Sequence, residues 1–299
     1  MLDYLVDSPQ KIVVIGDIFV SPDAMEEAVA CSLINYDKIT KLSWGASDKN
    51  GYATMQLNVE KNGPDAENYA AGLDEIIEDV DVILTHYSPI PERLIQKAKN
   101  LKLILTCRGG LEHIDIEAAN ERNIPVVNVI RNAEPVADFV LGLILSLTRN
   151  IALSHHELMS GNWKMEFYNS GYVTTLHELT VGIIGLGNIG LEVALRLKSL
   201  NVKIIAYDAY ISMDKLHSYG LENIPMMSSI EDVFSNADVI SLHLRLTEKT
   251  EKMIDKKYFS LMKPTAYFIN TARGGLVQQS DLIEVLKNRS IAGAALDVF

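Results

Sequence analysis

The stretch Val181-Gly-Ile-Ile-Gly185-Leu-Gly187-Asn188-Ile189-Gly190 decides the fold of the second half of this chain. An apolar run leads into a Gly-x-Gly-x-x-Gly turn, and residues 191–200 then have the composition of a helix. The first glycine permits a tight turn, the second lets the backbone approach a ligand, and the third lets the helix pack close to the strand. The N-terminus of such a helix offers N–H groups to phosphate oxygens. We expect the ligand-binding residues of this turn to be Gly185, Gly187, Asn188, Ile189 and Gly190.

A second strand, Lys203-Ile-Ile-Ala-Tyr-Asp208, follows this helix and ends in an acid. The order strand, glycine turn, helix, strand and acid is that of a dinucleotide site, in which the carboxylate accepts hydrogen bonds from a ribose diol. No Arg or Lys occupies residues 209–212 to receive a 2′-phosphate, which favours NAD over NADP. A glycine-rich turn without a ligand, as in any α/β protein, is the alternative.

The composition of the chain excludes several classes of protein. The 299 residues suffice for two domains, and the net charge of −12 without a basic run argues against binding to nucleic acid or an anionic membrane. Two cysteines, Cys31 and Cys107, are too few for a disulfide framework and fit a reducing cytoplasm. No signal peptide is expected, because Asp3 and Asp7 interrupt the N-terminus, and we therefore expect a cytoplasmic protein.

Strand-like and helix-like segments alternate along both halves of the chain. Alternation of this kind predicts parallel sheets with helices on both faces, so the expected class is α/β with two doubly wound parallel-sheet domains. We place the boundary at residue 130, giving domains of residues 1–130 and 131–299. The predicted strands are residues 11–16, 81–85, 101–106, 125–129, 181–184, 204–207, 239–242, 266–269 and 292–296.

One or two long helices are predicted between the domains, over residues 134–160. Phe139, Leu143, Leu147 and Ile151 recur at a spacing of four and give this segment an apolar face. That face is larger than one domain needs, so we predict that it pairs two copies of the chain in a C2 homodimer.

Five motifs resemble the D-isomer-specific 2-hydroxyacid dehydrogenase family, and the resemblance covers nearly the whole chain. Besides the cofactor turn they are Lys102-Leu-Ile-Leu-Thr-Cys-Arg-Gly-Gly-Leu-Glu-His-Ile-Asp115, Arg131-Asn-Ala-Glu-Pro-Val-Ala-Asp138, Ser241-Leu-His-Leu-Arg-Leu-Thr247 and Asn270-Thr-Ala-Arg-Gly-Gly-Leu-Val277. Many members carry Pro at the position of Arg245 and Gly at that of Arg108. The resemblance implies transfer of hydride between NAD and a D-2-hydroxy acid or the matching 2-oxo acid. It also implies that residues 1–130 form a flavodoxin-like substrate-binding domain and that residues 131–299 form a Rossmann NAD-binding domain.

The resemblance assigns a catalytic role to Arg273. A guanidinium grips a carboxylate through two parallel hydrogen bonds and stays charged, as the reaction requires. The same motif argues against a methyltransferase, whose glycine loop and strand-end acid look similar but which has no need of this arginine. The resemblance also implies that Thr271, Ala272, Arg273 and Asp297 line the cofactor.

The acid–base pair of the family is not found in this sequence. In the family a catalytic Glu follows closely after the segment that resembles Leu296-Asp-Val-Phe299, and a catalytic His comes later. We therefore expect the sequence to be C-terminally incomplete. A protein on the same scaffold that senses NAD, or acts as a corepressor, without catalysis is the alternative.

Four residues of the first domain are candidate substrate contacts: Arg108, Gly109, Gly110 and His86. Two glycines between a strand and a helix free backbone N–H groups that bind a carboxylate, and Arg108 would add a cation for a further acidic group. His86 ends a predicted strand. Metal-ligand spacing such as His-Glu-x-x-His is absent, so no metal is expected.

Overall fold

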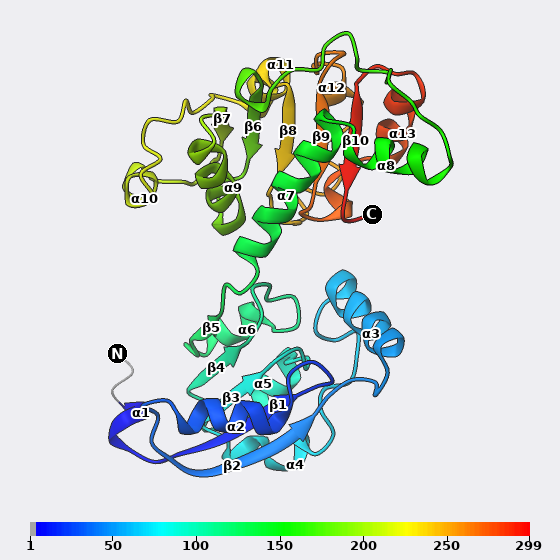
Figure 1. Cartoon of the computed structure of the whole chain (residues 1–299). Coiled ribbons are helices and arrows are strands. Elements are labelled where there is room, and N and C mark those ends of the chain that lie inside the picture. Colours follow the sequence, from blue (N-terminus) through cyan, green and yellow to red (C-terminus); the bar gives the residue numbers. More distant parts are fainter. Residues whose placement is uncertain (1–3) are drawn as a thin grey trace. The chain divides into compact units, whose positions relative to one another are not determined.

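The computed structural model describes residues 4–299, and the chain divides into two compact units between Arg131 and Asn132. Each unit is an α/β layer structure built on its own parallel five-stranded sheet. Figure 1 shows the strands of both units and the helices packed against them. The expected class, two doubly wound parallel-sheet units, is confirmed.

The sheet of the first unit has the strand order β2-β1-β3-β4-β5, which is the flavodoxin-like order. All four strand pairs are parallel. The edge strand β2 was not predicted from the sequence. The strands are β1 (Gln10–Gly16), β2 (Tyr36–Ser43), β3 (Val82–Thr85), β4 (Leu103–Thr106) and β5 (Val126–Asn128).

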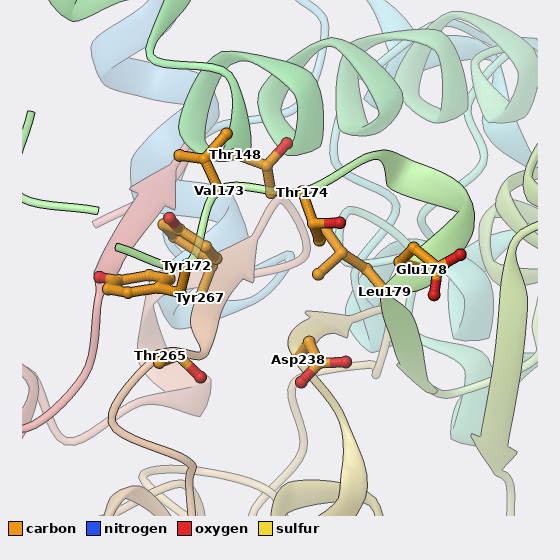
Figure 2. A pocket seen from close by; sticks show the side chains of 9 residues that line it. All are labelled: Thr148, Tyr172, Val173, Thr174, Glu178, Leu179, Asp238, Thr265 and Tyr267. Atoms are coloured by element: carbon orange, nitrogen blue, oxygen red, sulfur yellow. The ribbon is translucent and has the colours of Figure 1, made fainter. Parts of the chain in front are cut away.

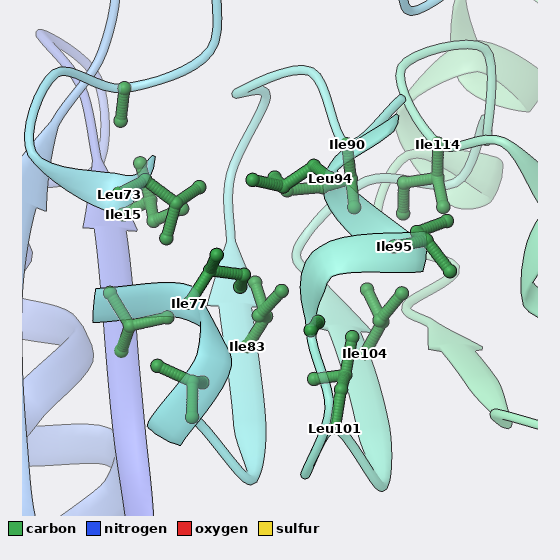
Figure 3. Packing of buried hydrophobic residues seen from close by; sticks show 14 of the residues in the cluster. Ile15, Leu73, Ile77, Ile83, Ile90, Leu94, Ile95, Leu101, Ile104 and Ile114 are labelled. Carbon is green, nitrogen blue, oxygen red and sulfur yellow. The ribbon is translucent and has the colours of Figure 1, made fainter. Parts of the chain in front are cut away.

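Both faces of this sheet are buried, because alternate residues of β1 enter different cores. Ile12 and Val14 pack with the first two helices, whereas Val13 and Ile15 pack with the later ones. Figure 3 shows the second of these cores, in which isoleucine and leucine side chains of strands and helices interdigitate. The helices are α1 (Tyr4–Asp7), α2 (Pro22–Ala30), α3 (Lys49–Asn62), α4 (Leu73–Ile76), η1 (Ile77–Asp79), α5 (Glu92–Lys97) and α6 (Ile116–Glu121).

The start of α2 follows the sequence signal for a helix N-terminus. Ser21 is the N-cap, its hydroxyl accepts a hydrogen bond from the Ala24 amide at 3.2 Å, and Pro22 is the first helical residue. Proline is favoured there because its fixed φ suits the helix and its missing N–H is not needed.

The sheet of the second unit has the order β10-β9-β8-β6-β7, again wholly parallel. A single parallel bridge between Ala206 of β7 and Met226 adds a vestigial sixth position beyond β7. With that position the order becomes 3-2-1-4-5-6, the Rossmann order. The strands are β6 (Thr180–Ile184), β7 (Lys203–Tyr207), β8 (Val239–Leu242), β9 (Tyr267–Asn270) and β10 (Gly293–Leu296).

Helices cover both faces of the second sheet as well. One core joins the sheet to α7 and α9, and the other joins it to α11, α12 and α13. The helices of this unit are α7 (Ala133–Thr148), α8 (Ile151–Met159), η2 (Leu176–Glu178), α9 (Asn188–Ser199), α10 (Met213–Ser218), α11 (Ile230–Asn236), α12 (Lys256–Phe259), η3 (Gly274–Leu276) and α13 (Gln279–Lys287).

The segment predicted as one or two helices forms two, because the chain turns sharply between α7 and α8. Asn150 caps α8 in the left-handed region with φ 55°, and the axes differ by 65°. The face that α7 buries contains Ala137, Val140 and Ile144, whereas Phe139 of the predicted apolar line is exposed. Among the described residues no single helix is long and apolar enough to cross a membrane; α7 and α8 pass that test only when taken together.

Candidate cofactor and substrate sites

The glycine turn follows β6 and begins α9 in the second unit. Gly185 has φ +96°, which L side chains rarely adopt, and a Cβ there would lie 2.7 Å from the His243 carbonyl oxygen. A Cβ on Gly190 would overlap the Gly185 carbonyl oxygen. Around the position of a Cβ on Gly187 no atom lies within 4 Å. The first and third glycines are therefore required by packing, whereas the second faces open space.

The N-terminus of α9 directs its amides toward that open space. Gly187 is the N-cap and makes no side-chain cap, and the first intrahelical bond is donated by the Leu191 amide to the Gly187 carbonyl at 2.9 Å. The preceding amides of Asn188, Ile189 and Gly190 are the ones that a helix leaves without intrahelical partners. The macrodipole places partial positive charge at the same point.

Asp208 lies at the carboxyl end of β7 and is tied to the glycine turn. One carboxylate oxygen accepts a hydrogen bond from the Leu186 amide at 2.7 Å, and the other accepts from the amides of Tyr210 and Ile211 at 2.7 and 2.8 Å. These bonds fix the carboxylate beside the turn. A carboxylate has about four acceptor positions, so capacity for a ligand hydroxyl remains.

The Arg273 loop follows β9 on the same edge of the sheet. Asn270 braces it from within, because its side chain accepts from the Ala272 amide at 3.0 Å and donates to the Arg273 carbonyl at 2.9 Å. Arg273 itself is exposed, and its guanidinium donates to the Ala272 carbonyl at 2.9 Å. The Asp297 amide donates to the Asn270 carbonyl at 3.0 Å, so Asp297 lies beside the loop. Sequence reasoning did not single out Asn270 as the brace.

In the first unit His86 follows β3 and contacts a carboxylate that sequence reasoning missed. Its Nδ1 lies 2.6 Å from Oδ2 of Asp17, which follows β1, and each of the two side chains is 1% exposed. Tyr52 of α3 donates to the same oxygen at 2.5 Å. Burial alone would raise the pKa of Asp17, but hydrogen bonds from His86, Tyr52 and the Phe19 amide outweigh it and lower that pKa. Both residues follow neighbouring parallel strands, which was the available signal.

Arg108 lies in the loop after β4, in the same part of the first unit. Its guanidinium stacks over the Tyr87 ring at 4.8 Å and lies 3.9 Å from Oε1 of Glu60. The loop is held by a bond from the Asn128 side chain to the Gly109 carbonyl at 2.8 Å.

The Glu112 carboxylate lies against Gly110, where a Cβ would overlap it. A carboxylate of the chain itself therefore flanks the glycine pair that was predicted to bind a substrate carboxylate. Whether Gly109 and Gly110 bind substrate stays a prediction.

His113 is a second buried histidine near these groups. Its Nε2 is 3.0 Å from the Thr106 hydroxyl, and its ring stacks on Tyr87 at 4.8 Å. Burial, with smaller contributions from Arg108 and His86, lowers the pKa of His113 to about 3. The ring is therefore neutral at physiological pH.

Residues 141–299 match the D-isomer specific 2-hydroxyacid dehydrogenase, NAD binding domain family, which is more than half of the chain. The chain belongs to that family. The match contains the glycine turn, Asp208 and the Arg273 loop described above.

Curated relatives and solved structures agree with this family. The chain is 38% identical over 227 residues to D-3-phosphoglycerate dehydrogenase of Methanocaldococcus jannaschii, covering 75% of this chain and 42% of the relative. It is 39% identical over 233 residues to glyoxylate reductase of Thermofilum pendens, covering 75% of this chain and 66% of the relative. D-lactate dehydrogenase of Aquifex aeolicus, solved with NAD and lactic acid, has a TM-score of 0.67 and 25% identity, covering 96% of this chain and 77% of that one.

These comparisons bear on the alternatives. The three proteins are dehydrogenases or reductases by name, and they give no support to the sensor or corepressor alternative. The chain spans 42%, 62% and 46% of the first three curated relatives, so it corresponds to about half of their length.

A nicotinamide cofactor fits the residues of the second unit. Gly187 has open space around the position of a Cβ, and a helix N-terminus such as that of α9 suits the phosphates of a dinucleotide. On the neighbouring strand end, the hydroxyl of Thr271 is buried and finds no hydrogen-bond partner among the described residues. An unpaired buried hydroxyl is costly unless a ligand satisfies it. The predicted cofactor class, a nicotinamide dinucleotide, is confirmed by the matched NAD-binding family and agrees with a neighbour solved with NAD.

A cavity of 230 Å³ lies at the opposite edge of the second sheet. Glu178 and Leu179 precede β6, Asp238 precedes β8 and Thr265 precedes β9, so the cavity is at the amino ends of these strands (Figure 2). The cofactor residues are at the carboxyl ends, where ligands of open α/β sheets bind. No group of three or more His, Cys, Asp or Glu residues between residues 4 and 299 is placed to hold a metal ion.

Proposed function

We propose that this protein is an NAD-dependent oxidoreductase that transfers hydride between nicotinamide and a D-2-hydroxy acid or its 2-oxo acid. The observation that carries the proposal is the pairing, on one sheet edge, of the glycine turn with the Arg273 loop of the matched family. The first supplies a cofactor site, and the second supplies a fixed cation next to it.

The cofactor is held by three groups of the second unit. The amides of Asn188, Ile189 and Gly190 take the pyrophosphate, Asp208 takes the adenosine ribose, and Thr271 lines the site together with Ala272. The bound nicotinamide supplies the hydride donor or acceptor. Because Asp208 is a carboxylate with no Arg or Lys at residues 209–212, it favours the NAD ribose diol and disfavours a 2′-phosphate.

Arg273 holds the substrate and polarises its C2 oxygen. The Asn270 brace fixes the backbone on both sides of the arginine, so the guanidinium has a defined base from which to reach a carboxylate. The guanidinium forms two parallel charge-assisted hydrogen bonds with a carboxylate. The family resemblance implies that a His–Glu pair exchanges the proton of the C2 hydroxyl.

Residues of the first unit are proposed to contact the substrate. They are Arg108, Gly109, Gly110 and His86. The groups that these residues can bind indicate the class of 2-hydroxy acid.

Enantiomer pairs of 2-hydroxy acids test this function. We expect NAD⁺ reduction, followed at 340 nm, with the D but not the L forms of lactate and glycerate, and NADH oxidation with the matching 2-oxo acids. Tight NADH binding without turnover of any acid in the panel, or preference for the L forms, would contradict the proposal.

A further inference from the structure

A buried cluster of polar side chains occupies the carboxyl edge of the sheet in the first unit. Asp17 follows β1, His86 follows β3, and Tyr52 reaches both from α3. The three groups meet on one atom, because His86 and Tyr52 both hydrogen-bond to Oδ2 of Asp17. Ligands of parallel α/β sheets bind at this edge.

The arrangement fixes which nitrogen of His86 carries a proton. An ionised carboxylate only accepts hydrogen bonds, so Nδ1 of His86 donates to Asp17. Ionisation of Asp17 is supported by the lowered pKa of this carboxyl. In the neutral imidazole the other nitrogen, Nε2, is then an acceptor.

Nε2 of His86 is buried and has no hydrogen-bond partner in the described part of the chain. A buried acceptor without a partner costs about 1–3 kcal/mol, a cost that a hydroxyl of a ligand would remove. Nδ1, the other ring nitrogen, lies 2.6 Å from the Asp17 carboxylate, and this hydrogen bond fixes the orientation of the ring. Nε2 is then the ring atom that can accept a hydrogen bond from a ligand.

The cover over this cluster is thin. Asp17 begins the loop between β1 and α2, and its other oxygen accepts from the amides of Phe19 and Val20 at 2.9 and 3.1 Å. The Phe19 ring packs edge-on against Tyr52 with centroids 5.2 Å apart, yet Phe19 remains 57% exposed. An exposed aromatic side chain therefore packs on the Tyr52 side of the cluster.

The charges near His86 favour a hydroxyl over an anion as the ligand group. The nearest carboxylate, Asp17, touches the ring, and it would repel a phosphate or a second carboxylate. The cation of this region, Arg108, already faces Glu60 and the Tyr87 ring. A hydroxyl donates one hydrogen bond to Nε2 and adds no charge.

We propose that His86, positioned by Asp17 and Tyr52, accepts a hydrogen bond from a second hydroxyl of the substrate and thereby selects 2-hydroxy acids that carry a hydroxylated carbon beyond C2. This inference rests on the proposed function for its substrate, but His86 can be observed without turnover. His86 is a specificity residue, and Asp17 and Tyr52 are positioning residues.

Nitrogen-15 spectra of the histidine side chains test the inference directly. In the complete protein with NADH, His86 should have a protonated Nδ1 and an unprotonated Nε2. D-glycerate, which has a 3-hydroxyl, should shift the Nε2 signal, whereas glycolate, which has none, should leave it in place. His177, whose Nδ1 bonds to the Asn201 carbonyl in the second unit, is the internal control and should not move with either acid.

Kinetics with two 2-oxo acids give the second readout. His86→Asn should raise KM for hydroxypyruvate by roughly 3- to 10-fold, the loss of about one hydrogen bond, and leave KM for glyoxylate within twofold. His113→Asn, the matched control at a buried histidine without a carboxylate partner, should change both values equally. His86→Gln, which is longer, is the second variant if the asparagine protein does not fold.

The outcomes separate the two proposals. A glycerate-specific shift of His86 without turnover of any 2-oxo acid keeps the subsite and overturns the proposed function. Turnover with no ligand-dependent shift, and with equal effects of His86→Asn on both substrates, overturns the subsite and keeps the function. A larger shift with 3-phosphoglycerate than with D-glycerate also overturns it, because it assigns the cluster to an anion.

Discussion

The carbonyl oxygen of Gly185 occupies the space that a Cβ on Gly190 would need, so that no side chain fits on the third glycine of the turn. Gly187, between them, has no neighbour around the position of a Cβ. Packing therefore requires a glycine at position 190, whereas a glycine at position 187 leaves space for a ligand. Gly190→Ala should lower the free energy of unfolding by about 1–3 kcal/mol through overpacking. Gly187→Ala should unfold like the unchanged protein, because its φ of −69° suits alanine, but bind NADH at least tenfold more weakly.

Urea unfolding and calorimetric titration of NADH measure the two effects on the same pair of variants. Equal NADH affinity of Gly187→Ala and the unchanged protein would show that no phosphate approaches the turn at this point.

Asp208 should determine the choice between NAD and NADP. Asp208→Ala should weaken NADH binding by about 1.5–3 kcal/mol, the value of a hydrogen bond to a charged group. It should also reduce the ratio of the affinity for NADH to the affinity for NADPH. Because Asp208 also accepts from three backbone amides, Asp208→Asn is the matched control that keeps the shape of the side chain. Tighter binding of NADPH than of NADH by the unchanged protein would refute the assignment of Asp208.

Arg273→Lys should reduce kcat/KM for 2-oxo acids by roughly 10- to 100-fold. A lysine keeps the charge, but a point charge cannot replace two parallel hydrogen bonds to a carboxylate. Arg289→Lys, at an exposed position after α13 in the same unit, is the control and should leave kcat/KM unchanged. NADH affinity should be nearly the same in both variants, since the role assigned to the guanidinium is toward the substrate. If Arg273→Lys retains full kcat/KM, the carboxylate is held elsewhere.

The sequence predicted the sheets because buried parallel strands are continuous apolar runs bounded by turn residues. It did not predict β2, whose edge position leaves Lys38 and Lys41 in the strand and removes the apolar signal. It predicted an apolar line on α7 but not which face of that helix packs on the sheet, since the helix is apolar on nearly all sides and Phe139 lies outside the core.

The glycine turn was predictable residue by residue because its spacing is local. The contact between Asp17 and His86 was not, because 69 residues separate them and only the strand order brings them together. The Asn270 brace was missed for a different reason. A polar residue at a strand end is common, and only the structure shows that the Asn270 side chain hydrogen-bonds to the Ala272 amide and to the Arg273 carbonyl.

The stability of the first unit should fall as the pH is lowered from 7.5 to 5. His113 is buried and neutral, with a pKa of about 3 against 6.5 in an unfolded chain. Between these values the unfolded chain binds a proton that the folded chain does not, so acid favours unfolding. The loss begins near pH 6.5 and reaches about 2 kcal/mol at pH 5, at about 1.4 kcal/mol for each pH unit.

Asp17, whose pKa is also lowered in the fold, adds a second loss that begins only below about pH 4. Urea titrations at pH 7.5 and pH 5 measure the loss of unfolding free energy that we assign to His113. The variant His113→Asn should remove most of that loss. A pH dependence that is unchanged in that variant would mean that His113 is not its source.

The last prediction concerns assembly, which we propose to be a C2 homodimer formed through α7, α8 and the segment that follows. Large apolar side chains are exposed along this part of the chain to an extent that solitary surface residues do not explain. They are Phe139 (47%), Ile151 (55%), Leu158 (55%), Met159 (75%), Trp163 (80%) and Met165 (79%). A two-fold axis would let the same patch cover itself, which is the usual solution for soluble oligomers.

Light scattering at micromolar concentration should give twice the chain mass. Leu158→Glu, which places a charge within the patch, should give the monomer with NADH affinity unchanged. Val6→Glu, at an apolar residue of the first unit that is 52% exposed, is the matched control and should remain dimeric. A complete protein that is monomeric at this concentration, or a dimer that survives Leu158→Glu and Trp163→Glu together, would place the interface elsewhere or remove it.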